Sequence, residues 1–376
     1  MLTNITIENF KCHQHTDLEL KPLTILTGIN GFGKSSVIQS LLLLRQSYTK
    51  GLLSKGVDLN MPLVNIGIVD DALYKLTSEP IIKFSICYCD NKRDQFVFSS
   101  DEKVMTDSFI PLKEHIGDGQ YTYESLFNNN FQYISALRLG GQSVFGKNTV
   151  AVTKNHQISL EMGKGELVGH FLYEYQNIPT QNFIGGLEDI PLIEQVKYWE
   201  QKISKGITIN VEQSSDYTNY VIKYGYELEG IRPVQNLRAE NIGFGVSYTL
   251  PVIVAILSAK KGDLIIIENP EAHLHPDAQL DLGNLICMAA QHGVQLIIET
   301  HSDHIVNAVQ ISCKQFHDTD GGKGISKDNV AIHYFGSRNE GLAAKSEQVK
   351  IQDDGSVDYQ PKGFFDTIEN SLNQLY

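Results

Sequence analysis

Residues 28–35 read GINGFGKS, which matches the pattern G-x-x-x-x-G-K-[ST] in full. An apolar run at residues 23–26 precedes the match, and an apolar helical stretch at residues 37–44 follows it. This order of strand, loop and helix is the context in which such a loop cradles nucleotide phosphates. Its glycines let backbone N–H groups turn inward, with the positive end of the next helix behind them. The sequence therefore predicts that the chain binds a nucleoside triphosphate.

Individual residues of this loop have expected roles. Lys34 is expected to reach the β- and γ-phosphates, and the Ser35 hydroxyl to bind Mg²⁺. The predicted nucleotide-binding residues of the loop are Asn30, Gly31, Phe32, Gly33, Lys34, Ser35 and Ser36, with ATP and Mg²⁺ as the ligands. The alternative is a plain glycine-rich turn between a strand and a helix, which the correct spacing and context disfavour.

The composition indicates a large chain with a substantial core. Its 376 residues are 41% hydrophobic, enough for one large domain with an insertion or for two domains. We find no signal-peptide run at the start and no apolar stretch of membrane-spanning length, so we expect a cytoplasmic protein without a membrane partner. The five cysteines form no metal-binding pattern. A net charge of −13 argues against a protein that coats DNA, although a local basic groove is compatible with it.

The nucleotide-binding elements are split along the chain, which we divide into four parts. Residues 1–46 alternate polar and apolar residues, as a β-hairpin leading into the loop strand would. Residues 47–231 are predicted to form an inserted, largely β lobe, in which residues 193–203 have the pattern of an amphipathic helix. Apolar runs return at residues 232–310, and residues 311–376 form a short C-terminal domain. No heptad run predicts a coiled-coil arm.

A second group of polar residues lies where the aliphatic run at residues 264–267 ends in Glu268. A carboxylate at the end of a buried strand beside a phosphate-binding loop can hold the Mg²⁺ water shell, so Glu268 and Ser35 are the predicted metal residues. Asn269 follows, where many such ATPases have the glutamate that activates water, and an amide cannot accept that proton. Glu271 is the nearest replacement. Slow hydrolysis, or a base from elsewhere, is the open alternative.

The aliphatic run at residues 294–298 is followed by Glu299 and, two residues later, by His301. A polar residue at the end of a strand next to the carboxylate strand can sense the γ-phosphate, and a histidine can donate or accept a hydrogen bond there. We therefore predict catalytic roles for Glu271, Glu268 and His301. The alternative for His301 is a histidine at the start of a helix capped by Ser302 or Asp303.

Nearby histidines raise a different hypothesis. His273 and His275 precede a predicted helix, and His301 and His304 follow later in the sequence. A metal-dependent nuclease built on His273, His275, Asp303 and His304 would be the functional form of such a site. Neither histidine pair has the i, i+4 helical spacing of a zinc enzyme, so the pattern disfavours this hypothesis.

Longer segments resemble a known group of ATPases. They are IENFKCHQHTDLELKPLTILTGINGFGKSS at residues 7–36, FGVS at 244–247, LIIIENPEAHLHP at 264–276 and ETHSDH at 299–304. These segments resemble the ABC-type ATPases of the SMC, RecF-like and OLD (overcoming lysogenization defect) branch rather than the transporter branch. A compact prokaryotic family of this branch has a P-x-G-F-F-D segment in a short C-terminal domain, here Pro361, Gly363, Phe364, Phe365 and Asp366. FQYISALR at residues 131–138 is similar to a strand-end segment of that family.

The resemblance implies an α/β fold, namely an ABC-type, SMC-like P-loop ATPase head with a largely β inserted lobe and a short C-terminal extension. It places Gly243, Phe244, Gly245, Val246 and Ser247 where the ABC signature loop stands, before a helical stretch beginning at residue 248. In the family this loop acts on the ATP of the opposite subunit. Gly243, Gly245 and Ser247 are therefore predicted to bind the nucleotide held by a second chain. A plain glycine turn before a helix is the alternative.

We therefore predict an ATP-gated, dimerising switch or sensor in DNA maintenance or in defence against phage. The resemblance implies a homodimer or larger homo-oligomer that controls a separate effector protein, a nuclease or another toxin, and DNA is a further candidate ligand. The roughly 65 residues after Gln310 are too few for the nuclease domain that OLD proteins append. A nucleotide-bound scaffold that does not hydrolyse ATP is the alternative, because the signature is not LSGGQ and Asn269 replaces the usual glutamate. A transporter subunit would need the usual signature and a membrane partner.

Overall fold

The computed structural model describes residues 1–100, 105–117, 119–181, 189–227, 234–338 and 343–364. Their packing forms two compact units, each assembled from separate stretches of the chain. Unit 1 consists of Met1–Asn128, Glu299–Asp303 and Lys327–Tyr376, and unit 2 of Asn129–Ile298 and His304–Ser326. The short stretch Glu299–Asp303 thus returns to unit 1 between two stretches of unit 2. It carries Glu299 and His301.

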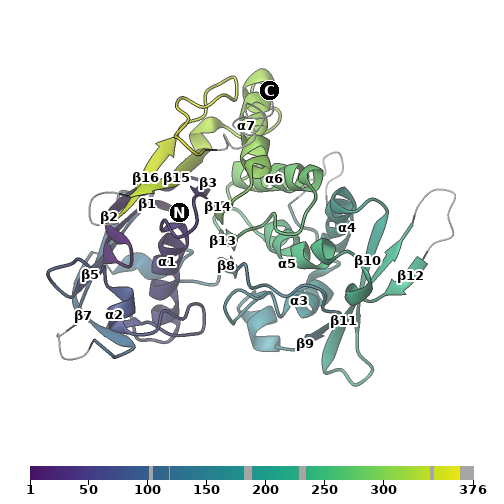
Figure 1. Ribbon diagram of the computed structural model, residues 1–376. Coiled ribbons are helices and arrows are strands. Elements are labelled where there is room, and N and C mark those ends of the chain that lie inside the picture. Colours follow the sequence, from purple (N-terminus) through teal and green to yellow (C-terminus); the bar gives the residue numbers. More distant parts are fainter. Residues whose placement is uncertain (101–104, 118, 182–188, 228–233, 339–342, 365–376) are drawn as a thin grey trace. The chain divides into compact units, whose positions relative to one another are not determined.

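Unit 1 contains an antiparallel sheet with the strand order β2, β1, β5, β6, β7 and β4. Figure 1 labels β1, β2, β5 and β7 among these strands. Its strands are β1 (Leu2–Phe10), β2 (His13–Glu19), β4 (Gly56–Asp58), β5 (Ile81–Tyr88), β6 (Arg93–Ser99) and β7 (Phe109–Ile116), and the short helix α2 (Val69–Ala72) also belongs to this unit. The pair β1 and β2 is the hairpin predicted at the start of the chain, with Ile5 opposite Leu18. Ile5 and Ile7 are fully buried, because alternate residues of β1 point to the covered face.

A second group of strands in unit 1 positions the GINGFGKS loop. β3 (Leu23–Gly28) pairs in parallel with β15 (Val330–Arg338), which pairs in antiparallel with β16 (Ala344–Val349). Gly28, the last residue of β3, has a φ of 126°, and a Cβ added to it would lie 2.3 Å from the carbonyl oxygen of Phe335. Only glycine fits this approach. The chain then turns into helix α1 (Lys34–Thr49).

The described part of the P-x-G-F-F-D segment packs on β15. Phe364 is buried and lies edge-on to Tyr334, with ring centroids 5.5 Å apart. The Tyr334 hydroxyl donates a hydrogen bond of 3.1 Å to the carbonyl oxygen of Lys362. Phe365 and Asp366 lie outside the described residues. The end of the described chain is therefore fixed to the strand that also supports the glycine loop.

Unit 2 combines helices with two groups of strands. Its helices are α3 (Val168–Tyr175), α4 (Leu192–Ile203), α5 (Phe244–Ser258), α6 (Pro276–Gln291) and α7 (Asp303–Asp318), the first residue of α7 belonging to unit 1. One group of strands is β9 (Val144–Gly146), β10 (Ile207–Gln213), β11 (Asn219–Tyr226) and β12 (Val234–Leu237), in which β11 pairs in antiparallel with the other three. The other group is β8 (Phe131–Ile134), β13 (Leu264–Glu268) and β14 (Gln295–Glu299), where β13 is parallel to β8 and adjacent to β14.

Helix α5 forms the centre of unit 2. It is apolar on every side, and residues 246–257 are all buried, as expected for a helix that protein surrounds. It packs against α3, α4 and α6 and against strands β8 and β13 (Figure 1). Pro251 lies inside the helix and next to Gly165, where an added Cβ would lie 2.8 Å from the proline Cβ. Proline has no N–H to donate within the helix, so α5 lacks one backbone hydrogen bond at this position. The proline ring packs closely against Gly165 instead.

Several predicted elements are confirmed. The chain is a mixed α/β protein, the amphipathic pattern at residues 193–203 is α4, and the aliphatic runs at 264–267 and 294–298 are β13 and β14. Helix α5 begins at Phe244, whereas the sequence predicted a start at 248. A glycine in the first turn argues against a helix by propensity, but the first N–H groups of a helix need no partner within it.

The predicted division of the chain follows its motifs and stays a prediction. By packing, residues 47–128 belong to unit 1 and residues 129–231 to unit 2, so the predicted inserted lobe contributes to both units. None of the helices in the described stretches is long and apolar enough to cross a membrane.

Candidate nucleotide-binding site

The GINGFGKS loop forms the turn between β3 and α1. Gly31 and Gly33 have φ angles of 79° and 107°, which glycine adopts without strain. Gly33 is also the N-cap of α1, so the positive end of this helix lies directly behind the loop. Ile29, Asn30 and Gly31 are exposed at the tip of the turn. The local geometry is that of an anion site at a helix N-terminus.

Lys34 is held inside the loop. Its side chain is 3% exposed, and its Nζ donates hydrogen bonds of 2.9 Å to the carbonyl oxygens of Gly28 and of Ile29. Burial lowers the pKa of Lys34, and the nearby charge of Glu299 opposes this shift. The loop therefore holds a cation at its centre, where phosphate oxygens would be neutralised.

Glu299 and His301 lie at this loop. Ser35 Oγ donates a hydrogen bond of 2.8 Å to Oε1 of Glu299, which is 5% exposed. The N–H of Thr300 donates to the carbonyl oxygen of Leu26 at 3.1 Å and so ties this stretch to β3. Burial and the charge of Lys34 lower the pKa of His301, while a hydrogen bond to the backbone of Gly28 raises it. The sequence placed His301 at the phosphates but assigned no role to Glu299.

His13 contacts the backbone of the loop at Gly33, which the sequence did not predict. It is fully buried, with Nε2 3.0 Å from the carbonyl oxygen of Gly33 and Nδ1 2.8 Å from the hydroxyl of Thr16. A carbonyl oxygen can only accept, so Nε2 carries the proton and Nδ1 accepts from Thr16. Burial, with a smaller effect of the Lys11 charge, lowers the pKa of His13 to about 4. The ring is therefore neutral at physiological pH.

Arg338 holds the tip of the loop, and it too was missed. Its Nη2 donates a hydrogen bond of 2.7 Å to the carbonyl oxygen of Gly31, and its guanidinium lies 4.8 Å from the ring centre of Phe32. Arg338 is the last residue of β15 and more than 300 positions away from the loop in sequence. No local pattern connects the two.

Glu268, the predicted metal residue, belongs to unit 2. Its carboxylate accepts hydrogen bonds from the hydroxyl of Tyr133 at 3.1 Å and from the N–H of Ala136 at 3.2 Å. Burial raises its pKa, although both hydrogen bonds and the charge of Arg138 oppose the shift. Glu268 is thus fixed at the end of β13, as the sequence predicted. The predicted residues fall into two groups, one in each unit.

Arg138 organises this part of unit 2. Its guanidinium donates to the carbonyl oxygens of Glu268 at 2.8 Å and of Asn269 at 2.7 Å, and its Nε donates to that of Tyr248 at 2.9 Å. It also lies 3.9 Å from the centre of the Tyr248 ring. Burial lowers its pKa to about 10, so it stays charged at neutral pH. Arg138 joins the end of the Glu268 strand to α5. The segment FQYISALR was the available sequence signal.

Asn269 and Glu271 form the turn after β13. Asn269 has a φ of 44°, a left-handed conformation that asparagine tolerates better than most residues. This conformation gives a structural reason for asparagine at this position. Glu271 is 8% exposed, and its backbone carbonyl oxygen accepts a hydrogen bond of 3.1 Å from the backbone N–H of Leu274. Its role as a base stays a prediction.

The predicted signature residues form the first turn of α5 and its N-cap, rather than a loop before the helix. Gly245 must be glycine for packing, because an added Cβ would lie 2.4 Å from the carbonyl oxygen of His273. Ser247 is 6% exposed, and its hydroxyl accepts from the N–H of Gly141 at 2.8 Å and donates to Phe244 O at 3.1 Å. Gly243 and Phe244 are the exposed members. An added Cβ on Gly243 would meet nothing within 4 Å, so packing does not require glycine there.

The histidine-based metal site finds no support in the described part of the chain. No group of three or more His, Cys, Asp or Glu side chains is arranged there to hold a metal. His275, a member of the proposed cluster, is 74% exposed and pairs with Asp277. A magnesium site needs fewer protein ligands than such a cluster, because one or two carboxylates together with phosphate oxygens are enough to bind Mg²⁺. The hydroxyl of Ser35 and the carboxylate of Glu299 are oxygen donors of this kind.

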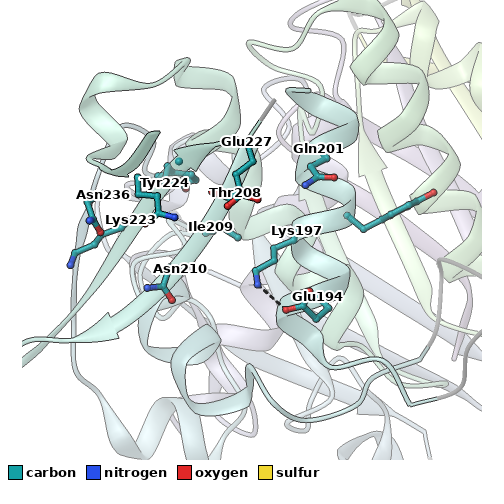
Figure 2. A pocket seen from close by; sticks show the side chains of 13 residues that line it. Glu194, Lys197, Gln201, Thr208, Ile209, Asn210, Lys223, Tyr224, Glu227 and Asn236 are labelled. Carbon is teal, nitrogen blue, oxygen red and sulfur yellow. Dashed lines mark hydrogen bonds and ion pairs between the residues drawn. The ribbon is translucent and has the colours of Figure 1, made fainter. Parts of the chain in front are cut away.

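A separate cavity of about 630 Å³ lies in unit 2, between α4 and the strands β10, β11 and β12 (Figure 2). Its lining is polar and carries both charges. Lys197 donates a hydrogen bond of 2.8 Å to Glu194, and Lys223 and Glu227 lie elsewhere on the wall. None of the predicted nucleotide-binding residues lines it. The glycine loop of unit 1 therefore remains the candidate nucleotide site.

Three family models match the chain. A model described as "AAA ATPase domain" matches residues 1–158, and a model described as "AAA domain, putative AbiEii toxin, Type IV TA system" matches residues 167–307. A third, described as a protein of unknown function (DUF3696), matches residues 325–375. The first two matches contain the predicted loop and the Glu268 strand.

Two curated proteins and one solved structure are similar to this chain over most of its length. The Old nuclease of Escherichia phage P2 is 24% identical over 365 residues, which are 87% of this chain and 61% of that protein. The OLD nuclease of Thermus scotoductus is 23% identical over 397 residues, 99% of this chain and 70% of that protein. This chain thus spans less than two thirds of the phage protein. The structure of an SMC head bound to the C-terminal winged-helix domain of ScpA matches with a TM-score of 0.54 and 12% identity, covering 93% of this chain and 98% of that one.

Together these findings support an SMC/OLD-like ATPase. The resemblance inferred from its motifs is confirmed, and so is the predicted fold class, since the likeness to the SMC head shows the ABC-type fold. The relatives that carry a function in their names are nucleases, and that function belongs to those proteins.

Protonation of His13 should weaken this SMC/OLD-like ATPase in acid. The pKa of about 4 lies below the ordinary 6.5, so the fold favours the neutral ring. The resulting stabilisation is complete above about pH 6.5 and is lost as the pH falls toward about 4, because the unfolded chain takes up the proton first. It amounts to about 3 kcal/mol at most. We expect urea unfolding of His13→Gln to depend less on pH between about pH 7 and about pH 4.5 than that of the wild type. Equal dependence would contradict the role of His13.

Proposed function

We propose that this SMC/OLD-like ATPase binds Mg·ATP at the GINGFGKS loop and uses it as a switch. ATP favours a two-fold dimer, and slow hydrolysis releases it. The switch controls a separate effector, a nuclease or another toxic protein, in DNA maintenance or in defence against phage. The observation that carries the proposal is the assembly of Lys34, Ser35, Glu299 and His301 around one glycine loop within unit 1.

The residues of the loop account for nucleotide binding. Backbone N–H groups and the N-terminus of α1 bind phosphate oxygens, and Lys34 exchanges its carbonyl partners for the β- and γ-phosphates. Ser35 and Glu268 are the residues that the family precedent assigns to Mg²⁺, which supplies neutralisation of phosphate charge when it is bound. We assign contact with the γ-phosphate to His301, and its position beside Gly28 and Lys34 supports this role.

Hydrolysis is the step that Asn269 affects most directly. An amide at Asn269 cannot accept a proton from water, so the base must be another group. Glu271 is buried within unit 2 and is the first carboxylate after Asn269 in the sequence. We assign it the role of base with slow turnover, and the cleavage of ATP serves to end a signal rather than to drive continuous work.

Dimerisation supplies the part that one glycine loop lacks. A loop of this kind leaves one side of the γ-phosphate open, and the family precedent covers it with the signature residues of a second chain. Gly243 and Phe244 are exposed at the N-terminus of α5, and Phe244 is 45% exposed although it is aromatic. An isologous dimer that pairs these residues with the partner's loop closes on itself.

A separate effector and a DNA ligand are proposed from the relatives. Two curated relatives are named nucleases, and this chain spans only part of the length of each. These names support a nuclease as the effector that we propose for this ATPase. Asn269 also supports a second candidate, a scaffold in which bound nucleotide stabilises a defence complex without hydrolysis.

Replacing Lys34 with alanine tests nucleotide binding. The change removes a charge-assisted contact to phosphate, worth about 1.5 to 3 kcal/mol, so the affinity for ATP should fall about tenfold or more. Isothermal titration calorimetry measures the effect, with Lys50→Ala, at the end of the same helix, as the matched control. Equal ATP affinity of a folded Lys34→Ala protein and the wild type would refute the assignment of the loop.

Replacing Glu271 with glutamine tests the base. Glutamine keeps the shape and hydrogen bonding of the side chain but cannot accept the proton, so ATP should bind normally while hydrolysis falls by about 10²-fold or more. Phosphate release measured under single-turnover conditions gives the rate. If the wild type binds ATP without measurable hydrolysis, the scaffold replaces the switch. If Glu271→Gln hydrolyses ATP at the rate of the wild type, another group is the base.

Mixing two inactive variants tests the dimer. Ser247 is buried, so a large residue there would disturb unit 2 itself, whereas an arginine at Gly243 has room within its own chain. Gly243→Arg should bind ATP but not hydrolyse it, and Lys34→Ala should not bind it. A mixture contains dimers with one complete site, from the loop of one chain and the signature of the other, so partial ATPase activity should return.

The control for this experiment is Gly146→Arg, because an added Cβ at Gly146 in β9 also meets nothing within 4 Å. It should keep full activity. Sedimentation with ATP would show dimers for Gly146→Arg and monomers for Gly243→Arg. Full activity of Gly243→Arg alone, as a monomer, would refute the shared site.

A further inference from the structure

The hydrogen bond between Ser35 and Glu299 brings a carboxylate to the oxygen that the loop motif reserves for magnesium. Ser35 Oγ and Glu299 Oε1 are 2.8 Å apart, and the hydroxyl donates. Ser35 is exposed, whereas the Glu299 side chain is 5% exposed. The carboxylate is close enough to Lys34 to raise the pKa of that amine. Both residues belong to unit 1, so their contact does not depend on unit 2.

A carboxylate in this place opposes the binding of phosphate unless a cation accompanies the nucleotide. Glu299 is negative, and the triphosphate of ATP carries several negative charges, so the two repel each other at close range. Lys34 offers one positive charge, which must then serve both Glu299 and the phosphates. A divalent cation between carboxylate and phosphate would turn this repulsion into attraction.

The distance between the two oxygens suits magnesium. Mg²⁺ binds oxygen at about 2.0 to 2.1 Å in octahedral geometry, so two adjacent ligands lie about 3.0 Å apart. The 2.8 Å between Ser35 Oγ and Glu299 Oε1 is close to this value. An ion could therefore replace the hydrogen bond if the two oxygens moved apart by about 0.2 Å in total.

We propose that Glu299 is a ligand of the magnesium ion that accompanies ATP, next to Ser35. Without nucleotide, Glu299 holds the Ser35 hydroxyl in the position it takes in the metal site. The inference rests on the proposed binding of Mg·ATP and adds to it a second carboxylate, from the same unit as the loop. Glu268, the residue that the motif suggests, is fixed in unit 2 by Tyr133 and Ala136.

The test separates a metal ligand from a residue that only positions Ser35. Glutamine at position 299 can still accept the hydrogen bond from Ser35, but it lacks the negative charge that Mg²⁺ prefers. The affinity for the non-hydrolysable analogue AMP-PNP is measured by calorimetry, once with EDTA and once with Mg²⁺. The ratio of the two affinities reports on the metal, and no hydrolysis is needed.

In Glu299→Gln we expect this ratio to fall by about tenfold or more compared with the wild type. With EDTA the variant should bind AMP-PNP as well as the wild type or better, because a negative charge near the phosphates has gone. Ser35→Ala should lower the ratio in the same way. Binding of Mn²⁺ in the presence of AMP-PNP, followed by electron paramagnetic resonance, should weaken in parallel.

The matched control is Asp94→Asn, which neutralises another buried carboxylate of unit 1. Asp94 accepts a hydrogen bond from His115, and both residues are distant from the glycine loop in the sequence. It should leave the ratio unchanged. A ratio in Glu299→Gln equal to that of the wild type, in folded protein, would overturn the proposal, as would a wild type whose affinity ignores Mg²⁺. A wild type that does not bind AMP-PNP at all would instead overturn the proposed function.

Discussion

The close approach of Gly28 to Phe335 is the constraint on which the nucleotide site depends. The end of β3 lies so near the backbone of β15 that only glycine fits, and the positive φ of Gly28 starts the turn into α1. From this turn follow the buried position of Lys34, the place of the α1 N-terminus and the reach of Ser35. The return of Glu299–Asp303 to unit 1 then brings Glu299 and His301 to the same loop.

Unit 2 has an organising contact of its own. Arg138 donates hydrogen bonds to backbone carbonyl groups at the end of β13, in the turn that follows it and in α5, and its guanidinium covers the ring of Tyr248. A movement of the backbone at Glu268 and Asn269 would therefore shift Arg138 and, through it, the helix α5 that begins next to Gly243. In the switch that we propose, this contact would link the carboxylate strand to the proposed dimer surface.

The sequence predicted the features that depend on local patterns. The glycine loop, the strand before it, the helix after it and the aliphatic strands that end at Glu268 and Glu299 all follow from spacing and periodicity over a few residues. The hydrogen bond between Ser35 and Glu299 joins positions 264 apart, and that between Arg138 and Tyr248 joins positions 110 apart. No local pattern encodes such pairs, which explains why Glu299 and Arg138 were missed. The engaged hydroxyl of Ser247 was missed for the same reason, because its partner Gly141 comes from another segment.

The most direct test of this account is a crystal structure of the chain with Mg²⁺ and AMP-PNP, at a resolution that distinguishes the metal from water. The account predicts the triphosphate in the GINGFGKS loop, with Lys34 on its β- and γ-phosphates. It also predicts a magnesium ion about 2.1 Å from Ser35 Oγ and from one oxygen of Glu299. A magnesium ion bound by Ser35 and phosphate, with Glu299 turned away from it and still buried, would contradict the central claim.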